Sequence, residues 1–174
     1  MVGNSGSGKS TIARSLAARL DVVWVELDSI YHQPGWQPLP TDEFRARVAD
    51  AVAADGWVVD GNYSAVRDLV WARADTVVWV DPPHRTVMRR IIWRSLRRAV
   101  LRTTLWNGNH ERWRNLFTTN PEDSVIAWAW QRHKIYRDRY LAASRNPRWA
   151  HLRFIRIRSR AEVRRLLLQA QSID

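Results

Sequence analysis

A glycine-rich segment close to the start of the chain limits the possible folds more than any other part of the sequence. Residues 3–11 read Gly-Asn-Ser-Gly-Ser-Gly-Lys-Ser-Thr and match the pattern G-x-x-x-x-G-K-[ST] in full. Glycines at positions 3, 6 and 8 allow the backbone to curl so that successive N–H groups point at one anion. A helix that begins near Lys9 adds the positive end of its dipole to the same place. The motif therefore predicts a phosphate-binding loop between a strand and a helix.

The residues after the last glycine supply the chemistry of this loop. The Lys9 ammonium can reach the β- and γ-phosphates of a nucleotide, and the Ser10 hydroxyl can ligate Mg²⁺. A chance turn rich in glycine and serine is the alternative. Against it, Ile12, Leu16 and Leu20 recur every four positions, as a helix after the loop requires. We therefore expect ATP to bind to nine consecutive residues: Gly3, Asn4, Ser5, Gly6, Ser7, Gly8, Lys9, Ser10 and Thr11.

The strand that should precede this loop is very short. Only Met1 and Val2 stand before Gly3. Two residues do not fill the central strand of a doubly wound sheet. Either the natural start lies several residues upstream or the first strand is truncated, and we favour the upstream start.

The rest of the chain alternates between apolar runs and helical patterns. We expect strands over residues 22–28, 57–60, 76–80 and 151–157, and helices over residues 41–52, 64–74, 85–101, 120–143 and 159–170. Thr41 is a candidate N-cap of the first of these helices, and Ser159 with Glu162 forms a capping box for the last. Strands that alternate with helices predict an α/β fold, a mostly parallel sheet of about five strands with helices on both faces.

Residues 95–119 interrupt this alternation. They are basic and contain the turn sequence Asn107-Gly108-Asn109. We expect them to form a lid over the nucleotide, inserted in a single domain of residues 1–174.

Composition excludes several classes of function. The chain has no cysteine, which excludes disulfides, thiolate catalysis and cysteine-bound zinc, and its five histidines show no metal-ligand spacing. No apolar run approaches the roughly 18 residues that span a bilayer, and no signal-peptide pattern opens the chain. We therefore expect a cytoplasmic protein without a membrane partner.

The positive charge is concentrated in the second half of the chain. Residues 1–84 have a net charge of −4, whereas residues 85–174 have a net charge of +15. Of the 28 basic residues only Lys9 and Lys134 are lysines, which a GC-rich genome would also produce. The asymmetry indicates a surface or lid that meets phosphates.

The order of these motifs resembles the adenylate-kinase-like P-loop kinases over most of the chain. The strand that ends in Asp60-Gly61 matches a strand of that family whose aspartate holds the Mg²⁺ shell. Arg90 and Arg94 match the R-x-x-x-R pair at the start of the family's lid. The resemblance implies a nucleotide-kinase fold, Mg·ATP as phosphate donor, and direct in-line transfer to an acceptor.

A smaller bacterial group, described as DNA topology modulation or adenylate-kinase-like proteins, is more similar still. The similarity lies in Leu27-Asp28, in Pro34-Gly35-Trp36 and in Asp60-Gly61-Asn62-Tyr63, and residues 105–109 are similar to an actinobacterial branch of that group.

The chain also departs from true adenylate kinases. Asn62-Tyr63-Ser64 replaces the Phe-Pro-Arg that follows the second acidic strand, and Leu27-Asp28-Ser29 occupies the region of the AMP-holding Thr-Gly-Asp. The zinc-type lid is missing. The resemblance therefore implies the kinase machinery but not AMP as acceptor.

Two aspartates compete for the metal role, because Asp60 and Asp81 both end hydrophobic strands. We assign Mg²⁺ to Ser10 and Asp60, since Asp60 pairs with Gly61 as in the family and the two prolines after Asp81 favour a turn. Arg90 and Arg94 lie four residues apart on one helix face and can clamp the transferring phosphoryl group; a solvated basic face is the alternative. Arg89, Arg97, Arg98 and Arg102 are assigned to such a solvated face or a general phosphate patch.

The acceptor is expected near Asp28, which can orient an acceptor hydroxyl or take its proton. Asn62, Tyr63 and Arg67 complete the predicted acceptor site, and Arg73 is a further candidate for an anion on that side. Asp28 as a plain turn residue is the alternative.

Three of the eleven tryptophans, Trp24, Trp57 and Trp79, fall in expected strands and are assigned to the core. Trp36, Trp106 and Trp113 fall in loops, where they can stack on a base or sugar.

These observations lead to one main hypothesis and one alternative. The main hypothesis is an ATP-dependent phosphotransferase for an undefined small acceptor, with nucleotides and nucleosides among the candidates; its catalytic residues are Lys9, Asp28, Arg90 and Arg94. The alternative is a nucleotide-gated nucleic-acid-binding protein or a polynucleotide kinase, which the basic half permits. The chain shows no helix-turn-helix, zinc-finger or RNA-binding motif in support of that alternative.

Overall fold

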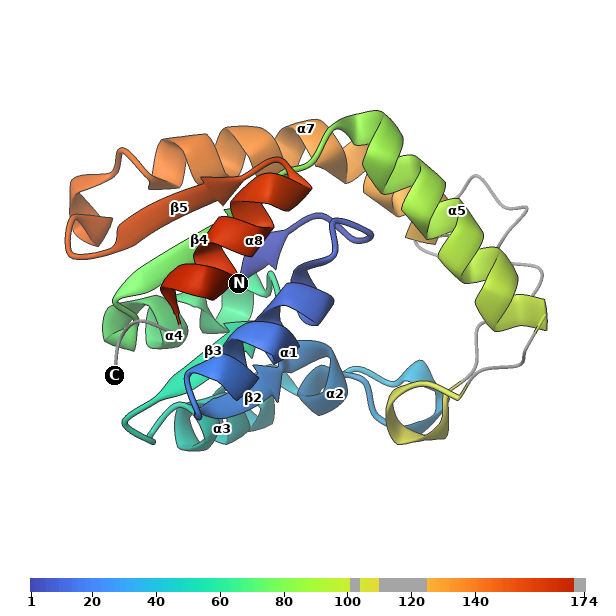
Figure 1. Cartoon of the computed structure of the whole chain (residues 1–174). Helices are drawn as coiled ribbons and strands as arrows, with labels where there is room; N and C mark the ends of the chain where they lie inside the picture. Colours follow the sequence, from blue (N-terminus) through green and yellow to red (C-terminus); the bar gives the residue numbers. More distant parts are fainter. Residues whose placement is uncertain (101–103, 110–124, 171–174) are drawn as a thin grey trace.

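The computed structural model describes residues 1–100, 104–109 and 125–170 of the chain (Figure 1). Several predicted features lie outside the described residues. They are the helix start at residues 120–123, Trp113, Arg102 and most of the predicted lid, residues 101–103 and 110–119.

The described residues contain five strands, and all their pairings are parallel. The strands are β1 (Val2–Gly3), β2 (Val23–Glu26), β3 (Trp57–Asp60), β4 (Thr76–Val80) and β5 (Arg153–Ile157). One group of strands has the order β1-β4-β5 and the other consists of β2 and β3. Met1 joins the two groups, because its amino group donates to the Val59 carbonyl at 2.6 Å and its carbonyl accepts from the Gly61 N–H at 3.3 Å. The five strands therefore follow one another in the order β2-β3-β1-β4-β5.

The described residues also contain seven helices and four short 3₁₀ turns, which lie between the strands or, for the last helix, after β5. The helices are α1 (Lys9–Arg19), α2 (Leu27–Tyr31), α3 (Thr41–Ala51), α4 (Arg67–Arg73), α5 (His84–Val100), α7 (Val125–Ala143) and α8 (Arg160–Gln169). The turns are η1 (Pro34–Trp36), η2 (Ser64–Val66), η3 (Trp106–Gly108) and η4 (Pro147–Trp149). No helix in the described ranges has the length and apolar composition needed to cross a membrane.

Helices cover both faces of the strands, as predicted, because alternate strand residues point to opposite sides. On one face, Val25, Val59 and Val77 join a core with residues of α3, α4 and α7. On the other face, Val58 and Val78 pack with residues of α1 and α8. Figure 1 shows α1 and α8 on the near side of the strands and α7 on a different side. This parallel, doubly covered sheet fits a Rossmann-like or P-loop-like layout.

Most predicted elements are confirmed. The strands at 57–60 and 76–80 have the predicted ends, and the Ser159–Glu162 capping box of α8 is complete. α5 begins one residue before its predicted start. Buried Trp79 belongs to the core as predicted, whereas Trp24 and Trp57 are only half-buried, and the Arg14 guanidinium lies 4.4 Å from the centre of the Trp24 ring.

Two local predictions were wrong. Thr41 is the first residue of α3 rather than its N-cap; the cap is Pro40, whose carbonyl accepts from the Phe44 N–H at 2.8 Å. Strand β2 ends at Glu26, so Asp28 lies in the first turn of α2 and not at a strand end. The chain turns there because Leu27 is buried in the core and the Ser29 hydroxyl donates a hydrogen bond to the Glu26 carbonyl at 2.7 Å.

Candidate functional site

The loop between β1 and α1 has the curled backbone that its glycines predict. Gly6 and Gly8 adopt φ values of 72° and 96°, in the left-handed region that favours glycine. Gly8 precedes α1 and has no side chain, so it makes no capping hydrogen bond to the first amides of α1. Amides in this arrangement, together with the helix dipole, are able to bind an anion.

Asn4 ties the loop to α7. Its Nδ2 donates to the Ala129 carbonyl at 2.8 Å, and its Oδ1 accepts from the Ser5 N–H at 2.9 Å. Because Asn4 is 6% exposed, both contacts are protected from water. These two contacts hold the start of the loop against α7.

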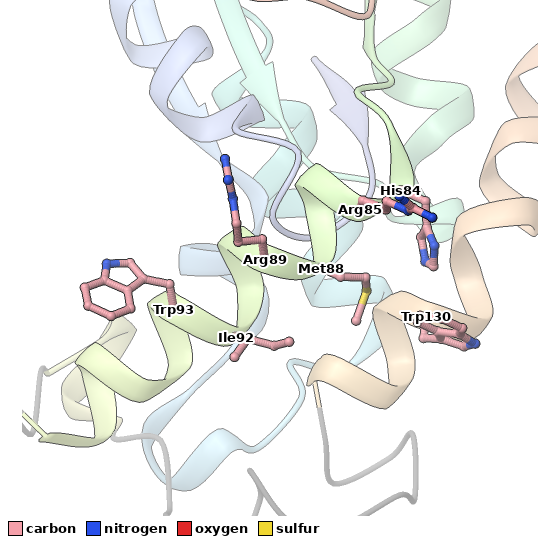
Figure 2. Close-up of a pocket in the computed structure, with 7 residues that line it drawn as sticks. All are labelled: His84, Arg85, Met88, Arg89, Ile92, Trp93 and Trp130. Carbon is pink, nitrogen blue, oxygen red and sulfur yellow. The ribbon is translucent and has the colours of Figure 1, made fainter.

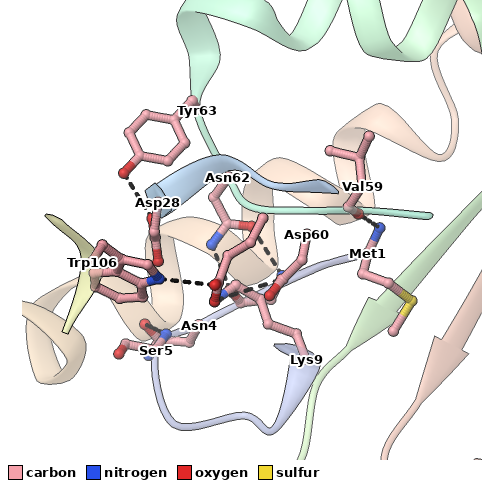
Figure 3. A network of polar contacts seen from close by, with 12 residues as sticks. Met1, Asn4, Ser5, Lys9, Asp28, Val59, Asp60, Asn62, Tyr63 and Trp106 are labelled. Atoms are coloured by element: carbon pink, nitrogen blue, oxygen red, sulfur yellow. Dashed lines mark hydrogen bonds and ion pairs between the residues drawn. The ribbon is translucent and has the colours of Figure 1, made fainter. Parts of the chain in front are cut away.

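Asp60, at the end of β3, lies beside Lys9 (Figure 3). The Lys9 Nζ atom is 3.9 Å from Asp60 Oδ1, and the aspartate side chain is 2% exposed. That Oδ1 atom makes no hydrogen bond with the described residues. A buried carboxylate oxygen that accepts no hydrogen bond is costly unless a cation or water completes its surroundings.

Two arginines of α5 reach the loop from the opposite side. The Arg90 Nη1 atom donates to the Ser7 carbonyl at 2.8 Å, and the Arg94 Nη2 atom donates to Ser5 Oγ at 3.0 Å. Their spacing of four residues places both guanidinium groups on one face of α5. Arg89 and Arg97 are exposed, as expected for the solvated face of this helix, and the side chain of Arg98 lies outside the description.

Asp81, the rival of Asp60, is engaged elsewhere. Its Oδ2 atom accepts hydrogen bonds from the Arg156 Nε atom, at 3.0 Å, and from Nη2 of the same guanidinium. The Arg137 Nε atom is 3.8 Å away. These cations already neutralise Asp81 and tie β4 to β5 and α7.

Asp28 is positioned by Tyr63. The Tyr63 hydroxyl donates to Asp28 Oδ1 at 2.7 Å, and His32 Nε2 lies 3.4 Å from the same hydroxyl. Burial, followed by the nearby Asp28 charge, raises the pKa of Tyr63 far above its ordinary value, while burial lowers the pKa of His32. At neutral pH the phenol therefore remains a donor and the imidazole is uncharged.

Glu26 is a site residue that the sequence reasoning missed. It is opposite Asp60 in the β2–β3 register, and its Oε2 atom accepts from the Trp106 indole N–H at 2.8 Å. Burial raises its pKa, the Trp106 hydrogen bond opposes the rise, and the charges of Asp60 and Asp28 add to it. Its place at the end of a strand, two residues before Asp28, was the signal that could have identified it.

The other predicted acceptor residues do not all face the site. The Asn62 amide pairs with the Gly3 backbone, as Oδ1 accepts from the Gly3 N–H at 3.0 Å and Nδ2 donates to the Gly3 carbonyl at 2.5 Å. Oδ1 also accepts from the Tyr140 hydroxyl at 2.8 Å, so Asn62 holds the sheet together. Arg67 and Tyr63 line a cavity of about 30 Å³ next to Asn62. Arg73 donates to the carbonyl of Ala53, which precedes β3. This contact lies at the end of β3 away from Asp60, so the assignment of Arg73 to the acceptor side was wrong.

Residues 104–109 dock against α2 and η1. The Asn109 Nδ2 atom donates to the Gln33 carbonyl at 3.0 Å, and its Oδ1 atom accepts from the Trp36 N–H at 2.9 Å. The Trp106 ring stacks on His32 at 5.9 Å between ring centres, and Trp36 meets His32 edge-on at 5.3 Å. This part of the predicted lid therefore contacts the expected acceptor side.

A larger hollow of about 550 Å³ lies between α5 and α7 (Figure 2). It is lined by His84, Arg85, Met88, Arg89, Ile92, Trp93 and Trp130. None of the loop residues and none of the carboxylates discussed above line it. It is therefore a surface feature separate from the loop between β1 and α1.

The described residues contain no cluster of three or more His, Cys, Asp or Glu side chains able to hold a metal by themselves. A Mg²⁺ ion bound with a nucleotide does not require such a cluster, because phosphates and water supply most of its ligands.

No protein-family model matches the chain, and no curated protein matches it. The resemblance to adenylate-kinase-like kinases therefore stays a prediction from the motifs.

Proposed function

We propose that this protein is an ATP-dependent phosphotransferase that acts on a small-molecule acceptor. The observation that carries the proposal is the convergence of five groups on one loop: the free amides at the start of α1, Lys9, Asp60, Arg90 and Arg94. Anion-binding donors, an acid at a neighbouring strand end and arginines on a facing helix are the parts that phosphoryl transfer requires.

The residues present fit Mg·ATP. The backbone from Gly3 to Thr11 would hold the phosphates, with Lys9 on the β- and γ-phosphates. The Ser10 hydroxyl and the Asp60 carboxylate would hold the Mg²⁺ shell, and the hydrogen-bond-free Oδ1 of Asp60 supports this role. The engagement of Asp81 with Arg156 supports Asp60 over Asp81. When bound, Mg²⁺ supplies positive charge to the phosphate oxygens.

The chain's own cations would then stabilise the charge of the transferring group. Lys9 approaches it from α1, and Arg90 and Arg94 approach it from α5. Because the arginine positions are fixed by contacts with Ser7 and Ser5, little rearrangement is needed when charge develops, which is the condition for electrostatic catalysis.

The test is ADP release from Mg·ATP across a panel of nucleosides, nucleoside monophosphates, sugars and short oligonucleotides, combined with calorimetric titration of ATP. Wild type is expected to bind ATP and to respond to a small acceptor. Lys9→Ala is expected to weaken ATP binding at least tenfold, because it removes the charge closest to the β- and γ-phosphates. Lys134→Ala, the same change on α7, is the matched control and should bind ATP like wild type.

Two results would contradict the proposal. Equal ATP affinity in wild type and Lys9→Ala would show that the loop of residues 3–11 does not bind the phosphates of ATP. Stimulation by oligonucleotides alone, with affinity that falls steeply as salt rises, would favour the nucleic-acid alternative.

A further inference from the structure

The sheet edge beside the phosphate-binding loop has a distinct chemistry. Glu26 ends β2, Asp60 ends β3 and Asp28 follows in α2, so three carboxylates gather where the two strands end. Figure 3 shows Asp28 beside Tyr63, with Trp106 on the same side, and Asp60 beside Lys9. Lys9 lies next to Asp60. No arginine or lysine of the described part of the chain pairs with Glu26 or Asp28.

The carboxylates of Glu26 and Asp28 make the acceptor side unfavourable for an acceptor that already carries a phosphate group. A phosphate dianion has no proton to offer Asp28 and would be repelled by both acids. The arginines that could offset this charge, Arg90 and Arg94, contact the loop on the donor side.

Arg67 does not change this conclusion. Its guanidinium is half-buried, with its carbon 5.5 Å from the centre of the Trp71 ring. It lines a cavity of about 30 Å³ with Asn62 and Tyr63, and its buried Nη2 atom makes no hydrogen bond with the described residues. Among the described residues, Arg67 makes no ion pair with Glu26 or Asp28, so it leaves the charges of these two carboxylates uncompensated.

The Oδ2 atom of Asp28 can accept a further hydrogen bond. Oδ1 is occupied by the Tyr63 hydroxyl, whereas Oδ2 makes no hydrogen bond with the described residues. Tyr63 remains protonated and His32 is uncharged at neutral pH, because burial raises the pKa of the first and lowers the pKa of the second. Tyr63 therefore stays a hydrogen-bond donor to Asp28, and the uncharged imidazole of His32 lies 3.4 Å from the Tyr63 hydroxyl through Nε2.

Aromatic rings form the wall next to this carboxylate. His32, Trp36 and Trp106 contact one another with ring centres 5.3–6.3 Å apart, and Tyr31 packs on Tyr63 at 4.6 Å. Apolar ring faces together with a few fixed hydrogen-bonding groups are typical of sites for neutral ring compounds.

On the basis of the proposed function, we infer that the acceptor is an unphosphorylated, uncharged sugar ring, free or as the ribose of a nucleoside, that receives the phosphoryl group on a hydroxyl held by Asp28. The hydroxyl proton passes to Asp28 Oδ2, and the hydroxyl oxygen forms the new bond to the γ-phosphorus of ATP. The bond from that phosphorus to the bridging oxygen breaks, and its electron pair leaves with ADP. Asp28 is the catalytic residue of this step, and Tyr63 is a positioning residue that acts through it.

The experiment compares unphosphorylated acceptors with their own monophosphates in the Mg·ATP assay. The pairs are nucleosides with nucleoside monophosphates and free sugars with sugar phosphates; the two kinds of pair distinguish the two sources of the ring. We expect turnover of at least one unphosphorylated member, at least tenfold faster than of its monophosphate. Asp28→Asn should lower kcat by about 100-fold or more, because proton transfer by a positioned carboxylate contributes that much.

Further variants separate chemistry from folding. Asp50→Asn, the same change on the exposed face of α3, is the matched control and should keep full activity. Tyr63→Phe should lower kcat about tenfold, through the loss of a hydrogen bond to a charged group, without changing the KM for ATP. Trp36→Ala should raise the KM for the acceptor about tenfold, whereas Trp93→Ala, on the exposed face of α5, should not.

The outcomes distinguish this inference from the proposed function. Turnover of monophosphates as fast as, or faster than, their unphosphorylated partners overturns the inference while the phosphotransferase proposal stands. So does full kcat in Asp28→Asn, or absence of turnover for every unphosphorylated member when ATP binds in a Lys9-dependent manner. Loss of Lys9-dependent ATP binding would instead overturn the proposed function.

Discussion

At the scale of single residues, two glycines with the same backbone conformation have different surroundings. Gly6 has a φ of 72° and Gly35 a φ of 71°. A Cβ atom added to Gly6 would lie 2.3 Å from the Ile91 Cγ1 atom of α5, whereas a Cβ atom on Gly35 would meet nothing within 4 Å. Gly6 is therefore required both by its conformation and by the close approach of α5, and Gly35 by its conformation alone.

Replacing each glycine by alanine separates the two costs. Gly35→Ala should lower the free energy of unfolding by about 1 kcal/mol, the cost of a left-handed backbone in a residue with a Cβ atom. Gly6→Ala should cost a further 1–3 kcal/mol, roughly, because the methyl group overpacks against Ile91. Urea denaturation of the two variants measures the difference, and equal losses would contradict the packing argument.

At the scale of elements, β2, β3 and residues 104–109 meet at Glu26. The Trp106 indole N–H donates to Glu26, and the Asn107 Nδ2 atom donates to the His32 carbonyl at 2.6 Å. Docking of residues 104–109 thus depends on polar contacts with the end of β2 and with α2. It also partly buries Glu26 near two other carboxylates.

Because Glu26 is partly buried, its negative charge is expected to lower the stability of the folded protein in a pH-dependent way. Its pKa is raised above the ordinary value of 4.5, first by burial, so its contribution to stability is complete below that value and is lost as pH rises through the pKa in the folded protein. Glu26→Gln keeps an oxygen for the Trp106 N–H and removes the charge. It should raise the free energy of unfolding at pH 7 by up to about 1 kcal/mol, and this gain should vanish near pH 4.

Thermal unfolding at both pH values, without nucleotide or Mg²⁺, measures this effect. Asp50→Asn serves as the control, because Asp50 is exposed and should respond little at either pH. A Glu26→Gln protein that is less stable than wild type at pH 7 would refute the assignment of a charge cost to Glu26.

At the scale of the whole molecule, the sheet is continuous only through its two-residue central strand. Strand β1 pairs with β4 over two residue pairs, and its link to β3 consists of the two backbone contacts of Met1. The Asn62 amide extends this link by pairing with the N–H and the carbonyl of Gly3. A side chain here replaces hydrogen bonds that a longer strand would make with its backbone.

Asn62→Ala should therefore destabilise the whole protein. It leaves the Gly3 backbone and the Tyr140 hydroxyl without their partner, which should cost about 2–3 kcal/mol of the free energy of unfolding in urea denaturation. Gln37→Ala removes an exposed amide from the loop before α3 and should change stability by less than about 0.5 kcal/mol. A stable Asn62→Ala protein with a raised KM for the acceptor would instead return Asn62 to the acceptor site.

Local sequence patterns determined the elements of this protein and the loop that begins its candidate site. The apolar runs at 57–60 and 76–80, the Ser159–Glu162 capping box and the glycine spacing of residues 3–8 depend on near neighbours in the chain, so they could be predicted. Only the tertiary structure decided which polar groups meet. Asn62 faces Gly3, Asp81 faces Arg156, and Glu26 joins Asp60 and Trp106, because strand order and packing bring together residues up to 80 positions apart.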